Sequence, residues 1–143
     1  MSFIRVYIHT VWETKNRFPF LTSDIKSKVI NHIKENATKK KIFIDTIDGS
    51  KDHIHCLFCL NADMSISTAL QLMKGESSHW INLEHLTKSK FGWGEDYFAE
   101  SVSPSDLERV RKYIRNQEEH HRKMTFKEEV EAFLKKFGFG GQG

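Results

Sequence analysis

Two histidines flank a single isoleucine in the segment KDHIHCLFCL, residues 51–60. Alternate side chains of a β-strand share a face, so His53 and His55 would project from the same side of a strand formed by this apolar run. Their Cα atoms would lie roughly 6–7 Å apart at about 3.3 Å per residue, which lets both rings bind one metal ion. Imidazole titrates near neutral pH and is a common metal ligand. The spacing therefore predicts a candidate metal site.

Three other interpretations of the histidine pair compete with that one. The histidines could be hydrogen-bonded residues of a half-buried strand with no chemical role. A zinc site that includes Cys56 and Cys59 is disfavoured, because Cys56 would face the other side of the strand and Cys59 would lie roughly 13 Å from His55. A nucleotide-hydrolysing histidine triad needs a further histidine at position 57, which is leucine.

A His–apolar–His metal site suits phosphodiester chemistry. A divalent ion held by two imidazoles keeps open coordination positions, where it can polarise a phosphate oxygen and offset the charge that develops in the transition state. Such a site still needs a third ligand and a nucleophile. Both must come from elsewhere in the chain.

The segment SPSDLERVRKYIRNQEEHHR supplies candidates for both roles. At about 100° per residue of helix, Leu107, Val110 and Ile114 form an apolar stripe. Tyr113 and Gln117 lie four residues apart at the edge of that stripe. A tyrosine in this position ordinarily packs against its neighbours with its hydroxyl in water, so the helical pattern alone leaves its role open.

Basic side chains surround the tyrosine on this helix. Arg109, Lys112 and Arg115 would favour a phosphate, and a nearby cation or metal ion would ease ionisation of the phenol. His120 falls close to the same face. The alternative is that these charges form an ordinary solvated surface. The same alternative applies to the run of three lysines at 39–41.

The elements that must position these residues form an α+β pattern. The order strand, helix, strand, strand, helix, strand predicts a ferredoxin-like split βαβ fold, with an antiparallel sheet, helices packed against it, a C-terminal catalytic helix and a final helix. Ser103 is expected to cap the catalytic helix, with Pro104 at its first position. The expected strands are 3–12, 42–47, 53–60 and 96–103; the expected helices are 22–40, 65–83, 104–121 and 125–137; and 86–95 is expected to be a loop.

Length and composition set the class of protein. The chain has 143 residues, of which 38% are hydrophobic and 29% charged, with a net charge of +3. We expect one domain over 1–137 and a flexible tail over 138–143. No apolar run is long enough to span a membrane, and the first residues lack the pattern of a signal peptide. Two cysteines make no disulfide framework, which favours the cytoplasm.

The motifs together resemble those of a known family. HIH at 53–55 with a helix-borne YIRNQ at 113–117 is similar to the HUH single-tyrosine transposases of insertion sequences, including the relatives associated with repetitive extragenic palindromes (REP). The likeness extends to about residue 137. It includes three further segments: HTVWETKNRFPFL near the start, MKGESSHWIN at 73–82 and FGWGEDYFAESVS at 91–103.

The resemblance implies a mechanism and partners. His53, His55 and Gln117 would hold Mg²⁺ or Mn²⁺, and Tyr113 would attack single-stranded DNA to give a 5′-phosphotyrosine and a free 3′-OH, without a nucleotide cofactor. The DNA would carry imperfect hairpins at transposon ends. The protein would act as a homodimer with joined sheets, and in some relatives the tyrosine helix of one subunit serves the other. The implied DNA contacts are Lys74, Arg109, Lys112, Arg115 and His120.

Two rival functions fit the same fold. A passive single-strand or hairpin binder would use an aromatic stacking platform made of Phe3, Tyr7, Phe43 and Phe58. It would bind without metal and form no covalent product. A replication-initiator nickase with the same HUH chemistry is the other rival, and such enzymes usually carry further domains.

Overall fold

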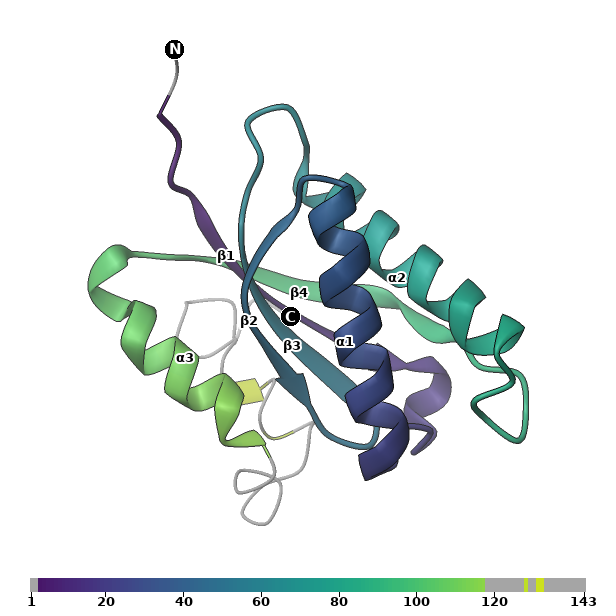
Figure 1. Ribbon diagram of the computed structural model, residues 1–143. Helices are drawn as coiled ribbons and strands as arrows, with labels where there is room; N and C mark the ends of the chain where they lie inside the picture. Colours follow the sequence, from purple (N-terminus) through teal and green to yellow (C-terminus); the bar gives the residue numbers. More distant parts are fainter. Residues whose placement is uncertain (1–2, 118–127, 129–130, 133–143) are drawn as a thin grey trace.

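A four-stranded antiparallel sheet with the strand order β2-β3-β1-β4 forms the centre of the computed structural model (Figure 1). The structure describes residues 3–117, 128 and 131–132. The strands are β1 (Tyr7–Thr14), β2 (Phe43–Gly49), β3 (His53–Cys59) and β4 (Trp93–Val102). The α-helices are α1 (Ser23–Lys39), α2 (Ile66–Leu83) and α3 (Leu107–Arg115), with short 3-10 turns at Lys15–Arg17 and Pro104–Asp106. This order and topology confirm the predicted ferredoxin-like α+β fold.

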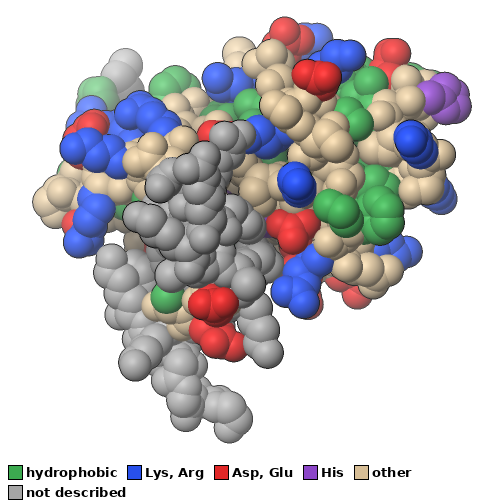
Figure 2. Space-filling view, turned by 90° about the horizontal axis from the view of Figure 1, so that it is seen from below, with side chains coloured by type: hydrophobic (Ala, Val, Ile, Leu, Met, Phe, Trp, Pro, Cys, Tyr) green, Lys and Arg blue, Asp and Glu red, His purple; other side chains and the backbone are tan. Residues whose placement is uncertain are grey.

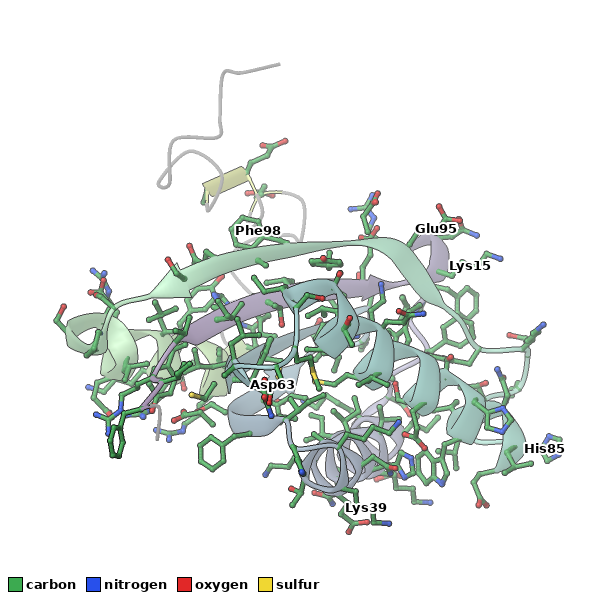
Figure 3. The ribbon with its side chains drawn as sticks, turned by 90° about the horizontal axis from the view of Figure 1, so that it is seen from above. Lys15, Lys39, Asp63, His85, Glu95 and Phe98 are labelled. Carbon is green, nitrogen blue, oxygen red and sulfur yellow. The ribbon has the colours of Figure 1, made fainter. Side chains whose placement is uncertain are left out.

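The main core lies between the sheet and the helices α1 and α2. Val29, Ile33 and Ala37 form the buried face of α1, because residues four apart lie on the same side of a helix. In α2, Ser65 caps the helix by accepting a hydrogen bond from the Thr68 backbone N–H at 3.1 Å. These two helices therefore cover one face of the sheet and leave the other to α3. Figure 3 shows Lys39, at the end of α1, and Phe98, on β4, on opposite sides of the sheet.

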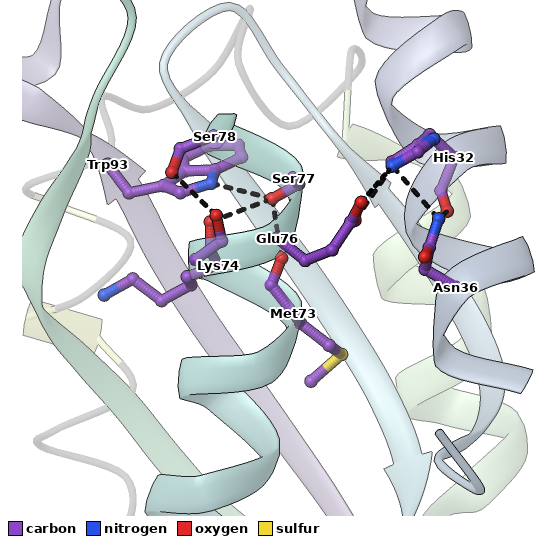
Figure 4. Close-up of polar contacts among 9 residues, drawn as sticks. His32, Asn36, Met73, Lys74, Glu76, Ser77, Ser78 and Trp93 are labelled. Carbon is purple, nitrogen blue, oxygen red and sulfur yellow. Dashed lines mark hydrogen bonds and ion pairs between the residues drawn. The ribbon is translucent and has the colours of Figure 1, made fainter. Parts of the chain in front are cut away.

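Polar contacts join the two helices to each other and to β4 (Figure 4). His32 on α1 stacks on Trp80 of α2 with ring centroids 3.9 Å apart, and its Nε2 lies 2.8 Å from the Glu76 carboxylate. Trp93 of β4 donates its indole N–H to the Ser77 hydroxyl of α2 at 2.9 Å. These contacts fix the spacing of the helices over the sheet.

Strand β3 divides its side chains between the two faces as the alternation predicted. Ile54, Cys56 and Phe58 are buried in the core beneath α1 and α2. His53, His55 and Leu57 point to the other face, where Leu57 packs with a small apolar cluster that also contains Val102, Leu107 and Ile114. The histidine pair thus lies on the face that α3 covers.

Several element boundaries differ from the sequence prediction. Strand β1 begins at Tyr7 rather than residue 3, and the apolar Phe3 and Ile4 before it are exposed. Strand β4 begins at Trp93, inside the segment 86–95 that was expected to be a loop, because Thr14 pairs with Trp93 across an irregularity in which β4 carries the extra residues.

The start of the third helix also differs. Ser103 and Pro104 lead into a 3-10 turn instead of α-helix, so α3 starts at Leu107. Residues 118–121, the expected helix 125–137 as a unit and the tail 138–143 lie outside the described residues. Within the described part of the chain, no helix is long and apolar enough to cross a bilayer.

The two faces of the hairpin formed by β2 and β3 make different contributions to stability. Ile54→Ala removes buried methyl groups from the main core, so we expect the free energy of unfolding to fall by about 2–5 kcal/mol. Phe43→Ala on β2, whose side chain is 65% exposed, should change it by no more than about 0.5 kcal/mol. Urea unfolding of both variants measures the difference. Equal losses would contradict this assignment of faces.

Candidate functional site

The structure brings the four motif side chains together within one chain. His53 and His55 are fully buried on β3, and α3 carries Tyr113 across them. The Tyr113 ring centroid lies 5.5 Å from that of His55, and the Gln117 amide oxygen lies 3.2 Å from His53 Nε2. Residues more than fifty positions apart in sequence therefore meet, as the paired motifs predicted.

Acidic and polar neighbours fix the orientation of His53. Its Nδ1 lies 2.8 Å from Asp52 Oδ1 and 3.0 Å from the Ser50 hydroxyl. A carboxylate can only accept a hydrogen bond, so the proton of the neutral ring resides on Nδ1. His53 Nε2 then presents a lone pair towards Gln117.

The Gln117 amide is also held in one orientation. Its Nε2 donates to the Tyr113 carbonyl at 3.1 Å, so the oxygen Oε1 must be the atom that faces His53. With the His53 proton on Nδ1, two acceptor atoms face each other across 3.2 Å. Such an arrangement is stabilised by a positive charge between or on the two groups, either a proton on His53 or a metal ion.

A buried series of side-chain hydrogen bonds orients His55. Its Nδ1 lies 2.9 Å from His9 Nε2, and His9 Nδ1 lies 3.1 Å from Glu100 Oε1. If the Glu100 carboxylate accepts the His9 Nδ1 proton, then His9 Nε2 accepts the proton of His55 Nδ1. The lone pair of His55 is thereby placed on Nε2. A carboxylate–histidine chain of this kind sets the tautomer and raises the basicity of a ligating imidazole.

The residues that orient the two histidines do not follow from the motif spacing in the sequence. His9 and Glu100 come from β1 and β4, and their roles depend on the sheet order, because His9 pairs opposite both Leu57 of β3 and Glu100 of β4. The sequence did contain a hint of the role of His9, because it is a histidine within an apolar strand and begins the segment HTVWETKNRFPFL, which resembles the family. The role of Asp52 was hinted at by its position, because it is an acidic residue directly before the HIH motif.

The spacing of two of the candidate donors fits an octahedral divalent ion. Adjacent ligands of an octahedral ion bound at about 2.1 Å lie about 3.0 Å apart, which is near the 3.2 Å between His53 Nε2 and Gln117 Oε1. The amide oxygen is a ligand type that suits Mg²⁺ and Mn²⁺, and imidazole is a ligand type of first-row transition metals. Among the described residues no three His, Cys, Asp or Glu side chains gather to hold a metal, and here the third candidate donor is the amide of Gln117.

The structure disfavours the alternative zinc site. Cys56 packs in the main core on the face opposite the histidines, as the strand pattern predicted. Burial raises the pKa of its thiol well above the usual value, which disfavours the thiolate that zinc requires. Cys56 and Cys59 are both free thiols.

The candidate DNA contacts divide between two places. Lys112 and Arg115 are exposed on α3 near Tyr113, and Arg109 there pairs with Asp106 at 2.7 Å. Lys74 lies on α2, across the sheet from the histidines, where its ammonium donates to the Gly94 carbonyl at 2.8 Å and burial lowers its pKa. His120 lies outside the described residues. In the view of Figure 2, basic and acidic side chains are interspersed, with no large field of one sign.

Comparisons with known proteins cover most of the chain. The family described as "Transposase IS200 like" matches residues 2–117, which include all four motif positions. The chain is 22% identical over 114 residues to the ISDra2 transposase TnpA of Deinococcus radiodurans, covering 76% of this chain and 81% of that protein.

Two solved structures share the fold. A crystal structure from Deinococcus radiodurans of a protein assigned as a transposase superposes with a TM-score of 0.65 at 21% identity, covering 81% of this chain and 93% of that one. A REP-associated tyrosine transposase bound to a REP hairpin gives a TM-score of 0.64 at 16% identity, covering 85% of this chain and 72% of that one.

The chain Glu100–His9–His55 should set the affinity of the site for a metal ion. We expect Glu100→Gln to weaken Mn²⁺ binding by about 10- to 100-fold, because His55 loses the partner that fixes its tautomer. Isothermal titration calorimetry measures the affinity. Glu95→Gln, an exposed substitution on the same strand, is the matched control and should bind Mn²⁺ as the wild type does. An unchanged affinity in Glu100→Gln would remove this role.

Proposed function

Because the chain belongs to the IS200-like transposase family, we propose that it cleaves and rejoins single-stranded DNA at hairpin-marked transposon ends through a 5′-phosphotyrosine intermediate. The observation that carries this proposal is the convergence of Tyr113 and Gln117 on His53 and His55. A nucleophile, two imidazoles and an amide oxygen in one buried site match the needs of phosphodiester transfer better than those of binding alone.

The proposed reaction exchanges one phosphoester for another. The Tyr113 oxygen gives up its proton and attacks phosphorus, and the bond from phosphorus to the 3′-oxygen breaks. The 3′-oxygen leaves with the electron pair and takes up a proton. The number of phosphoester bonds is unchanged, so a 3′-OH can later attack the phosphotyrosine and rejoin strands without a nucleotide cofactor.

Each motif residue has a distinct part in this scheme. His53, His55 and Gln117 would hold a divalent ion, Mg²⁺ or Mn²⁺, which supplies Lewis-acid stabilisation of the phosphate charge when bound. Gln117 also connects the candidate ligands to the tyrosine, because its amide N–H donates a hydrogen bond to the Tyr113 carbonyl one turn earlier. Arg109, Lys112 and Arg115 would attract the DNA backbone near the phenol.

Two features of the assembly and its setting belong to the same proposal. Strand β4 is an edge strand of ten residues, a suitable surface for joining the sheets of a homodimer. We also propose that the protein acts in the cytoplasm, where its free thiols would stay reduced.

The rival passive binder keeps one specific observation in its favour. Phe3 and Phe43 are 90% and 65% exposed and could stack on bases. Phe58, however, is buried in the main core, so the predicted four-residue platform is wrong in that member. The replication-initiator nickase would share the chemistry and differ in the DNA that it rejoins.

The nucleophile can be tested with labelled hairpin DNA that has single-stranded flanks. With Mg²⁺ or Mn²⁺ we expect a protein-linked DNA fragment on a denaturing gel, and no such fragment with Tyr113→Phe or EDTA. Tyr97→Phe, which alters a partly exposed tyrosine on β4, is the matched control and should form the fragment. An adduct in Tyr113→Phe would remove the nucleophile, and DNA binding without any adduct in the wild type would favour the passive binder.

The arrangement within one chain makes a second prediction. Tyr113 lies beside His55 of its own chain, so a mixture of His55→Ala and Tyr113→Phe proteins should cleave no more than either variant alone. The two variants are refolded together to allow exchange of subunits, and cleavage is measured on the same gel. Regained cleavage would show instead that the tyrosine helix serves a neighbouring copy.

A further inference from the structure

One ion pair connects the tyrosine-bearing helix α3 to the edge strand β2. The Arg111 guanidinium donates two hydrogen bonds to the Asp45 carboxylate, from Nε to Oδ1 at 2.9 Å and from Nη2 to Oδ2 at 2.7 Å. The side chains are only 23% and 12% exposed. A paired contact of this kind fixes direction as well as distance, because the planar guanidinium and carboxylate must face each other.

A bulge in β2 presents the carboxylate to the helix. Ile44 pairs with Phe58 and Thr46 pairs with Leu57, so Asp45 is an extra residue that has no partner position on β3. Bulges of this type redirect a side chain at the cost of local pairing. The Thr46 hydroxyl donates to Asp45 Oδ1 at 2.6 Å and steadies the carboxylate.

Within the described part of the chain, the apolar contacts beneath α3 are few. Among these residues the cluster there has four buried members, Leu57, Val102, Leu107 and Ile114, whereas the core under α1 and α2 has sixteen. A small apolar cluster defines the face that a helix buries but resists sliding and rotation poorly. The direction of α3 therefore depends strongly on its polar contacts.

The electrostatics keep this contact charged at neutral pH. The hydrogen bond from Arg111 is the main cause that lowers the pKa of the Asp45 carboxyl below its ordinary value. Asp45 in turn is the main cause that raises the pKa of Arg111, with a second contribution from Glu108. Arg111 precedes Tyr113 by two residues, so a small movement at the pair becomes a movement of the phenol.

We propose that Asp45 and Arg111 are positioning residues whose ion pair sets where α3 places Tyr113 over His53 and His55 of the same chain. As a statement about catalysis, this inference rests on the proposed function. The claim that the ion pair positions α3 depends only on the contacts described above.

Asp45→Asn separates positioning from simple charge. Removing a carboxylate near a DNA-binding surface would, through charge alone, leave DNA affinity unchanged or raise it. Loss of positioning instead slows the covalent step, and we expect the single-turnover rate at saturating DNA to fall by about 10- to 100-fold. Arg111→Gln should do the same, and the double variant should be no slower than either single one, since both remove one interaction.

The matched control is Asp106→Asn on the approach to the same helix. It removes another Asp–Arg contact, which is exposed and joins residues three apart, so the rate should stay within about twofold of the wild type. An additive effect in the double Asp45/Arg111 variant, or an unchanged rate in Asp45→Asn, would overturn the role in catalysis.

Hydrogen exchange gives a readout that needs no DNA. In Asp45→Asn the backbone amides of α3 should exchange faster, while those of β1 and β3 should keep their protection. Unchanged exchange in α3 would overturn the inference even if the wild type cleaves DNA. Faster exchange in α3, with no adduct formed by the wild type, would contradict the proposed function but would support the positioning of α3 by Asp45 and Arg111.

Discussion

A neutral imidazole offers a lone pair on one nitrogen only while its other nitrogen holds the proton, and the site is built around that constraint. Asp52 and Ser50 lie within hydrogen-bond distance of Nδ1 of His53. His9, which itself contacts Glu100, lies within hydrogen-bond distance of Nδ1 of His55. Both Nε2 atoms thereby carry the lone pair of the ring, on the face of the sheet that α3 covers. Without these partners the rings could rotate or change tautomer, and the two histidines would no longer act together.

The fold satisfies this constraint by giving the two faces of one sheet different tasks. The face under α1 and α2 buries the large apolar core and holds the strands in register. Among the residues that the structure describes, the other face carries the buried imidazoles and a small apolar cluster beneath α3. Polar groups that would be costly in the main core are tolerated here because each imidazole has hydrogen-bonding partners, His53 in Asp52 and Ser50 beside it and His55 in His9 of the neighbouring strand.

Local patterns predicted the parts of this arrangement that depend on periodicity. The two-residue alternation of β3 placed His53 with His55 and set Cys56 against them, and the helical period placed Leu107 and Ile114 on the buried side of α3. The convergence of that helix on the strand followed only from the resemblance to a family, because no local pattern specifies which face a later helix covers.

The features that escaped prediction are non-local. The Glu100–His9–His55 chain needs β4, β1 and β3 side by side, in an order that the sequence does not state. The bulge at Asp45 appears only when two strands are paired residue by residue. Likewise, the segment 86–95 was expected to be a loop, yet pairing with β1 extends β4 back to Trp93. In each case a tertiary contact decides what the local sequence leaves undecided.

The candidate ligands share a property that follows from their chemical types. Two neutral imidazoles and a carboxamide carry no formal charge, so a dication among them would keep its full double charge. A phosphodiester and a tyrosinate, each with a single negative charge, would together balance it. A glutamate in place of Gln117 would neutralise half of that charge before any DNA arrived. The charges of the proposed nucleophile and target would thus complement a dication held by these uncharged ligands.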